Sequence, residues 1–212
     1  MKKLKVLDLN YNIDLSAFNF YVDSKELFVS LEVLKLSNTG YVVNSGYDIL
    51  ERVNSLKYLD LSGNERFTWA DRPFTFLIGK ENMTYLNFSG VDMNRTGCLG
   101  SSLPKDNNTL EPLLKLKTLD LSHCNLQGLN ISTFLNFPAL EYLDLSFNPI
   151  KSIPNNLTSV LPYLKVLSLS HYRLGVIHLD LSSNITGTLK ILDLMHNDIL
   201  ISDTAFDSGR YI

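Results

Sequence analysis

The sequence is poor in cysteine and lacks long apolar runs. Only Cys98 and Cys124 occur among its 212 residues, which excludes a disulfide-rich framework. The basic start, MKKLKVLDLNYN, is not followed by the apolar run of a signal peptide. No stretch approaches the roughly 18–20 apolar residues of a membrane span. We therefore expect either a cytosolic chain or a piece of a longer protein.

The sequence also lacks an excess of basic residues. Its formal net charge is −3, so it has no general attraction to phosphate backbones or anionic lipid at neutral pH. There is no phosphate-binding loop, no His or Cys cluster with metal-ligand spacing, and no nucleophile beside an arranged base. We therefore expect a protein that is not an enzyme and that holds no cofactor or metal.

What the sequence does contain is one frame that recurs, as in LKYLDLSGN at 56–64 and LEYLDLSFN at 140–148. Positions 1, 4 and 6 of this frame are Leu, Met or Phe in every copy, and position 9 is often Asn. One turn cannot bury such residues alone, so turns of this kind stack into a solenoid. The eight copies begin near residues 4, 31, 56, 83, 116, 140, 164 and 189.

This frame is the leucine-rich repeat pattern LxxLxLxxNxL. It predicts an α/β fold, a horseshoe segment with a parallel β-sheet on the concave face and irregular or short helical limbs on the convex side. We expect one domain over 1–212, with an insert at 94–108 and a return limb at 176–184. An Asn at position 9 is expected to hydrogen-bond the backbone of neighbouring turns. Val91 cannot do so, which predicts a local distortion or a buried water there.

Frame positions 2, 3, 5, 7 and 8 are expected to project from the concave face or its edge. The acids at position 5 allow two interpretations, a metal or catalytic row or simply a water-facing column. The second is favoured because no turn adds a convergent base. We predict ligand contacts at Tyr58, Asp60, Tyr85, Asp120, His123, Tyr142, Asp144, Phe147, His171 and His196.

Histidines gather at position 8 of the later repeats, where His171 and His196 are expected to be neighbours. Because histidine titrates near pH 6.5, this edge gains positive charge on acidification. One interpretation is an anion-binding edge that strengthens in acid. The other is a set of exposed histidines without consequence.

Sequons for N-glycosylation are more frequent than the composition predicts, which favours the secretory pathway. A glycan on Asn87 would block part of the inner face. Cys124 is expected to be a core thiol and Cys98 to lie on the insert, so that the two do not pair. The sequons are Asn82, Asn87, Asn94, Asn107, Asn130, Asn156 and Asn184.

The repeat period, the L-D-L-S-x-N turns and the sequons resemble the ectodomains of Toll-like receptors. LKVLDLNYNIDL at 4–15 and SLEVLKLSNTGYVV at 30–43 are similar to the central part of the endosomal, nucleic-acid-sensing branch. However, the 94–108 insert is far shorter than the processed loop of that branch.

The resemblance implies a binding segment of a single-pass membrane receptor in innate immunity, outside the cell or in the endosomal lumen. It would bind a microbial ligand or protein partner on the concave or lateral surface and act as a receptor homo- or heterodimer. Nucleic acid is expected only at acidic pH, and the segment itself would not contact the membrane. Two alternatives stay open, an extracellular adhesion or matrix protein and an intracellular protein-interaction scaffold.

Overall fold

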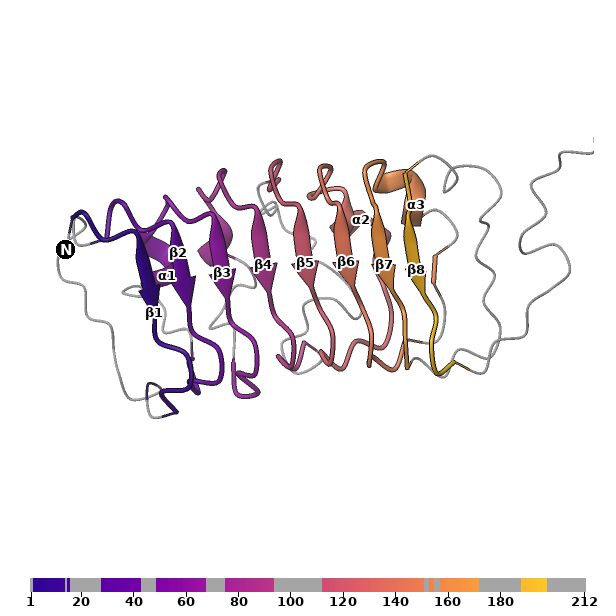
Figure 1. The fold of residues 1–212 in the computed structure, drawn as a ribbon, viewed down its shortest axis with the longest axis horizontal. Coiled ribbons are helices and arrows are strands. Elements are labelled where there is room, and N and C mark those ends of the chain that lie inside the picture. The colour runs from indigo at the N-terminus through magenta and orange to yellow at the C-terminus, as the bar shows by residue number, and fades with distance from the viewer. Residues whose placement is uncertain are drawn as a thin grey trace, which may run out of the picture.

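The computed structural model shows a single parallel sheet of eight strands in sequence order (Figure 1). The structure describes residues 2–13, 15, 28–42, 49–67, 75–93, 112–150, 153–154, 157–171 and 188–197. Neighbouring strands pair in parallel throughout, which confirms the predicted fold class. The strands are β1 (Val6–Asp8), β2 (Val33–Lys35), β3 (Tyr58–Asp60), β4 (Tyr85–Asn87), β5 (Thr118–Asp120), β6 (Tyr142–Asp144), β7 (Val166–Ser168) and β8 (Ile191–Asp193).

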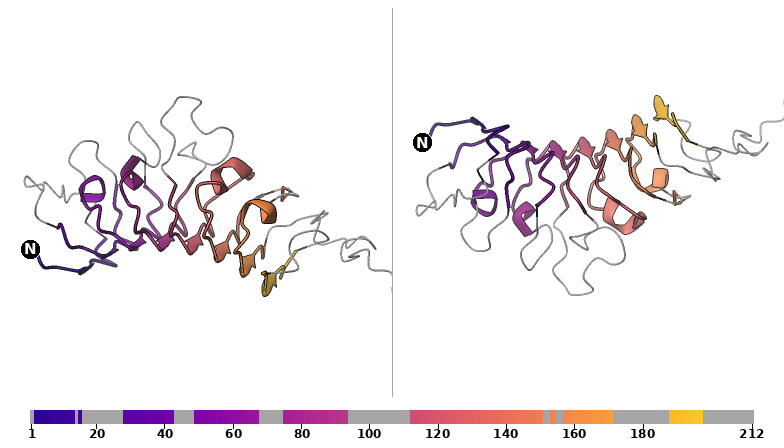
Figure 2. Two further views of the ribbon diagram at one scale, coloured as in Figure 1. Left: turned by 90° about the horizontal axis from the view of Figure 1, so that it is seen from above. Right: turned by 90° about the horizontal axis from the view of Figure 1, so that it is seen from below.

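Short helices occupy the return limbs, on the side opposite the strands (Figure 2). They are α1 (Ile49–Arg52), the 3-10 helix η2 (Thr75–Leu77), α2 (Ile131–Phe134) and α3 (Leu157–Val160). The Asn130 side chain caps α2 by accepting a hydrogen bond from the Ser132 N–H at 3.1 Å. The helices leave the opposite face of the sheet to the strand side chains, and we call that face the inner face.

The register places the same frame position of every repeat side by side. Leu34 pairs with Leu59, and Leu143 pairs with Leu167, so the leucines of successive turns form one continuous core. These leucines are fully buried, whereas Leu7 in β1 and Leu192 in β8 are only partly buried against the core. Burial of the repeated apolar positions is therefore what joins one turn to the next.

The position 9 amides of Asn64, Asn148 and Asn197 bond the backbone of two turns at once, as predicted. The Asn64 side-chain nitrogen donates to the Leu36 and Leu61 carbonyls, both at 2.7 Å. Its oxygen accepts from the backbone N–H groups of Thr39 at 3.1 Å and Tyr41 at 3.0 Å. One buried amide thus satisfies four backbone groups that the sharp bend leaves without a ladder partner.

The turn that carries Val91 has no position 9 amide, and its backbone is hydrogen-bonded without one. Val91 donates its own N–H to the Phe88 carbonyl at 2.9 Å, and Met93 donates to the Cys124 carbonyl at 2.8 Å. The Cys124 thiol also donates to Phe88, with 3.1 Å between sulfur and oxygen. Burial raises the pKa of this thiol to about 12, so it stays protonated as a donor. Cys124 is a free, buried cysteine, which confirms its predicted place in the core.

Some predictions fall on residues outside the part of the chain that the structure describes. These are the 94–108 insert with Cys98, the 176–184 limb, and the sequons at Asn94, Asn107, Asn156 and Asn184. Within the described residues, no helix has the length and apolar character needed to cross a bilayer.

Candidate ligand-binding face and edge

Tyrosines dominate the inner face in the middle of the solenoid. The register sets Tyr58 of β3 directly beside Tyr85 of β4. Their rings stack with centroids 4.1 Å apart and planes 3° from parallel. Burial raises the pKa of Tyr85 first of all, and the neighbouring Tyr58 hydroxyl raises it further. The Tyr85 hydroxyl therefore stays neutral and is available as a hydrogen-bond donor and acceptor.

The carboxylates at position 5 have a structural role that the sequence interpretation missed. Asp60, Asp120 and Asp144 each accept a hydrogen bond from the backbone N–H two residues further on, at 2.9–3.0 Å. Asn87 does the same with its amide oxygen at 2.8 Å. Each side chain therefore closes a small turn where its strand ends, as Asp and Asn do in Asx turns.

Asp120 is the carboxylate of this row whose pKa burial raises. Its pKa is raised, mainly because burial disfavours the charged form, and further because Asp144 and Asp60 repel it. In the described part of the chain, no three His, Cys, Asp or Glu side chains gather into a metal-binding group. The row is thus a set of turn-forming acids that lends the inner face negative charge.

Position 7 does not project for binding in four of the eight turns, which corrects the sequence prediction for those turns. Ser37, Ser122, Ser146 and Ser170 are all buried. Position 7 hydroxyls bond within the solenoid instead. Ser62 donates to Ser37 of the preceding turn at 2.8 Å, and Ser122 donates to Asp120 of its own turn at 2.7 Å. The chain bends away from the sheet after position 6, so the alternation of a strand does not continue to position 7.

Position 8 forms a column of left-handed residues along the carboxyl ends of the strands, which we call the edge column. Every member has a φ between 53° and 76°. Such values are unusual for residues other than Gly, Asn and Asp. The column comprises Tyr11, Asn38, Gly63, Gly90, His123, Phe147, His171 and His196.

The last four members of the edge column stack their rings into what we call the aromatic ladder. The centroids of His123 and Phe147 lie 4.1 Å apart, those of Phe147 and His171 lie 4.0 Å apart, and those of His171 and His196 lie 4.3 Å apart. The same left-handed turn repeats in each copy, which aims each ring at the next. All four side chains are exposed, and Phe147 is 43 % exposed. The predicted neighbour relation of His171 and His196 is confirmed.

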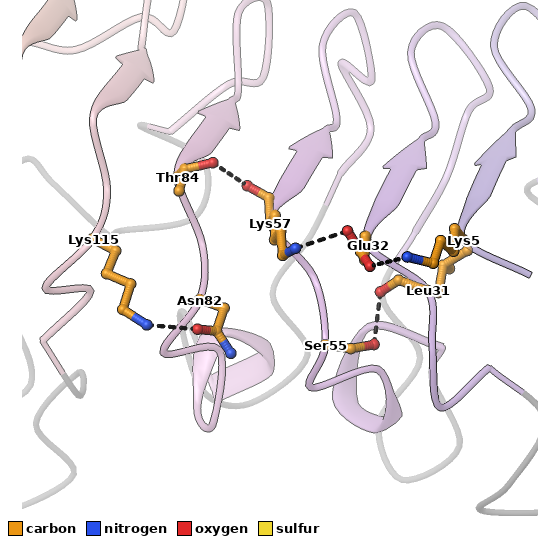
Figure 3. A network of polar contacts seen from close by, with 8 residues as sticks. All are labelled: Lys5, Leu31, Glu32, Ser55, Lys57, Asn82, Thr84 and Lys115. Atoms are coloured by element: carbon orange, nitrogen blue, oxygen red, sulfur yellow. Dashed lines mark hydrogen bonds and ion pairs between the residues drawn. The ribbon is translucent and has the colours of Figure 1, made fainter. Parts of the chain in front are cut away.

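Alternating charges line the opposite, amino ends of the strands. Glu32 lies between Lys5 at 3.0 Å and Lys57 at 2.8 Å (Figure 3). Glu141 lies likewise between Lys117 and Lys165. The adjacent lysine Lys57, and then Lys5, lower the pKa of Glu32. Because the lysines are exposed and the two glutamates only half-buried, the pairs contribute little stability, but they neutralise that end of the sheet.

Three sequon asparagines lie within the described residues. Asn82 is exposed, and its side-chain oxygen accepts from Lys115 at 2.7 Å (Figure 3). Asn130 uses its oxygen for the α2 cap, and Asn87 lies half-buried on β4. Whether any of them carries a glycan stays a prediction.

The predicted contact residues divide between two surfaces. Tyr58, Asp60, Tyr85, Asp120, Tyr142 and Asp144 lie on the strands of the inner face, while His123, Phe147, His171 and His196 make up the aromatic ladder. Their role in ligand binding stays a prediction.

Comparison with known proteins agrees with this geometry. A leucine rich repeat family model matches residues 115–174, and a second matches 188–200. A crystal structure of a TLR13–ssRNA13 complex matches 97% of this chain at 26% identity with a TM-score of 0.72. This chain covers 27% of that chain. An internalin (inlF) from Listeria monocytogenes matches 84% at 19% identity with a TM-score of 0.60, covering 45% of that chain. The chain therefore has a leucine-rich repeat fold, and its predicted resemblance to a Toll-like receptor ectodomain is confirmed.

Proposed function

We propose that this chain is a ligand-binding part of a Toll-like pattern-recognition receptor, which acts through ligand binding and receptor dimerisation in innate immunity. The similarity to TLR13 over 97% of the chain carries the proposal. In that structure the TLR13 protein is in a complex with ssRNA13, so a protein of this fold accommodates a ligand. On this proposal, the ligand-binding segment lies outside the cell or in the endosomal lumen.

The chemistry of the two surfaces supports a receptor that binds rather than catalyses. The inner face offers half-buried tyrosine rings and hydroxyls on a rigid sheet, which cost little entropy to order on binding. The edge column offers exposed stacked rings. Asp60, Asp120 and Asp144 make the inner face unfavourable for a phosphate backbone at neutral pH.

The histidines of the aromatic ladder would change that balance on acidification. Protonation of His123, His171 and His196 would place positive charge along one edge, where it could pair with phosphate oxygens. We therefore expect a short single-stranded RNA to bind at pH 5.5 and to bind at least about tenfold more weakly at pH 7.5, the loss of one charge-assisted contact. Fluorescence anisotropy of labelled RNA measures both affinities.

Two variants make this experiment decisive. In the double variant His171→Gln, His196→Gln the difference between the two pH values should largely disappear. Lys190→Gln serves as the matched control, because it removes an exposed positive charge from the amino end of β8 without touching the edge column. An unchanged pH dependence in the double variant would rule out the ladder as the anion-binding edge.

An adhesion, matrix or scaffold protein is the second candidate, since the internalin match shows the same fold. Expression in animal cells separates the compartments. A secretory receptor or matrix protein should lose mass on treatment with an N-glycosidase, and the exposed Asn82 is the best placed acceptor among the described sequons. A mass that the enzyme leaves unchanged would favour an intracellular scaffold.

A further inference from the structure

Two glycines interrupt the edge column just before the aromatic ladder begins. Gly63 and Gly90 hold the same left-handed backbone as the ladder residues, with φ of 67° and 76°, but they carry no side chain. His123, the first ring of the ladder, stacks on Phe147 with one face. Its other face is turned toward the space above Gly90, and both residues line the same pocket.

The space above Gly90 is open, at the position where the other ladder turns carry a ring. A Cβ at Gly63 would overlap the side chain of Asn38, which leans across that glycine. A Cβ at Gly90 would meet no atom closer than 3.4 Å. Adjacent turns are about 4.8 Å apart, so a planar group above Gly90 would be stacked on His123 and flanked by the Asn38 amide. An open pocket of about 720 Å³ lies here.

The lining of this pocket is acidic. Glu65 and Asp92 contribute carboxylates, and Asn125 donates to the Asp92 carboxylate at 3.3 Å. None of the described residues that line it is Lys or Arg. The pocket therefore combines a flat aromatic face with carboxylates and repels phosphate.

A guanidinium group fits a pocket that has a flat aromatic face, carries carboxylates and repels phosphate. It is planar and stacks on aromatic rings, it is always charged, and its N–H fork matches the geometry of carboxylates. A lysine ammonium shares the charge but neither the plane nor the fork. A nucleotide shares the plane but brings phosphate into a negative pocket.

We propose that this pocket binds an arginine side chain presented by a protein partner, with the guanidinium stacked on His123 and bonded to Glu65 and Asp92. The inference goes beyond the proposed function, because it assigns a protein contact to turns two to five. It shares only His123 with the proposed anion-binding edge, and the RNA experiment varies His171 and His196 instead. The RNA experiment above and the one below can therefore fail independently.

The test is a titration of the intact chain at pH 7.5 with a short peptide that carries one arginine, followed by NMR. The same peptide with lysine, the same peptide with citrulline, and free guanosine are the comparison ligands. We expect the arginine peptide to bind about tenfold more tightly than the lysine or citrulline peptide. Its guanidinium protons should shift upfield through the ring current of His123.

Two substitutions should weaken this binding without unfolding the chain. Gly90→His extends the ladder by one ring at a left-handed position, a conformation that histidine already adopts three times in this column. His123→Asn keeps a residue that tolerates this backbone but removes the stacking face. Each should weaken the arginine peptide by about tenfold or more. His171→Asn is the matched control, with the same backbone outside the pocket, and should change the affinity less than about twofold.

Several outcomes would overturn the proposal. Absence of arginine binding would do so, as would equal affinity for arginine and lysine, which would mean that charge acts without stacking. An equal effect of His171→Asn and His123→Asn would remove the pocket from the explanation. Tighter binding of guanosine than of the arginine peptide would identify the site as a nucleobase pocket. Circular dichroism and thermal melting of each variant verify that the fold is retained.

Discussion

Replacing Asn148 by Ala is expected to lower the free energy of unfolding by about 3–5 kcal/mol. The side chain is only 2 % exposed. Its nitrogen donates to the Leu121 and Leu145 carbonyls at 2.8 and 2.7 Å, and its oxygen accepts from the N–H groups of Cys124 and Leu126 at 2.9 and 3.0 Å. Alanine would leave all four backbone groups buried without partners, and each such group is costly. Urea denaturation measured by circular dichroism gives the change.

Asn12→Ala is the matched control for this prediction. Asn12 holds the same frame position, but it is exposed and donates only to the Leu9 and Asn10 carbonyls of its own turn. Water can replace those bonds, so we expect a loss of about 1 kcal/mol or less. Equal losses in the two variants would show that the amides do not join the turns.

Replacing Phe147 by Val is expected to lower the free energy of unfolding by about 2–3 kcal/mol, an unusually large effect for a side chain that is 43 % exposed. Two stacking contacts, with His123 and His171, are lost. In addition, a β-branched residue is strained at the φ of 58° that this position requires. Thermal and urea unfolding of the variant measure the sum of the two effects.

Phe147→Asn separates stacking from backbone strain. Asparagine also lacks the aromatic ring, but it tolerates left-handed backbone better than other residues do. We expect a loss of only about 1 kcal/mol. If Val and Asn destabilise the chain equally, the backbone of the edge column does not impose the constraint described above.

The sequence was sufficient to predict the fold because its signal is repeated eight times. Leucines at positions 1, 4 and 6 fix which side chains face the core, and the position 9 amides fix the bend. The sequence also showed which turn lacks this amide, since Val91 stands at position 9 there. What the sequence did not reveal was that the neighbouring Cys124 thiol would donate to the Phe88 carbonyl in that turn.

The left-handed edge column was missed although its signal is present in the sequence. Asn38, Gly63 and Gly90 share one frame position, and these residue types tolerate a positive φ. The histidines at the same position were interpreted by their charge, and their backbone conformation was not predicted. The burial of the position 7 serines was missed for a related reason, because the alternation of a strand was extended past the point where the chain turns.

The two candidate surfaces depend on different consequences of one geometry. The inner face follows from strands in register, which set Tyr58 beside Tyr85. The edge column follows from an identical turn after each strand, which stacks His171 on His196. Both surfaces therefore depend on the in-register pairing of successive strands.

Proton–proton Overhauser effects between the ladder rings in the free chain test this geometry most directly. Residues 123, 147, 171 and 196 are far apart in the sequence, and only an in-register solenoid brings their rings within about 5 Å, the reach of stacked aromatic pairs. We predict cross-peaks from Phe147 to both His123 and His171, and from His171 to His196. The account would be contradicted if circular dichroism shows a folded chain but these rings give no mutual cross-peaks.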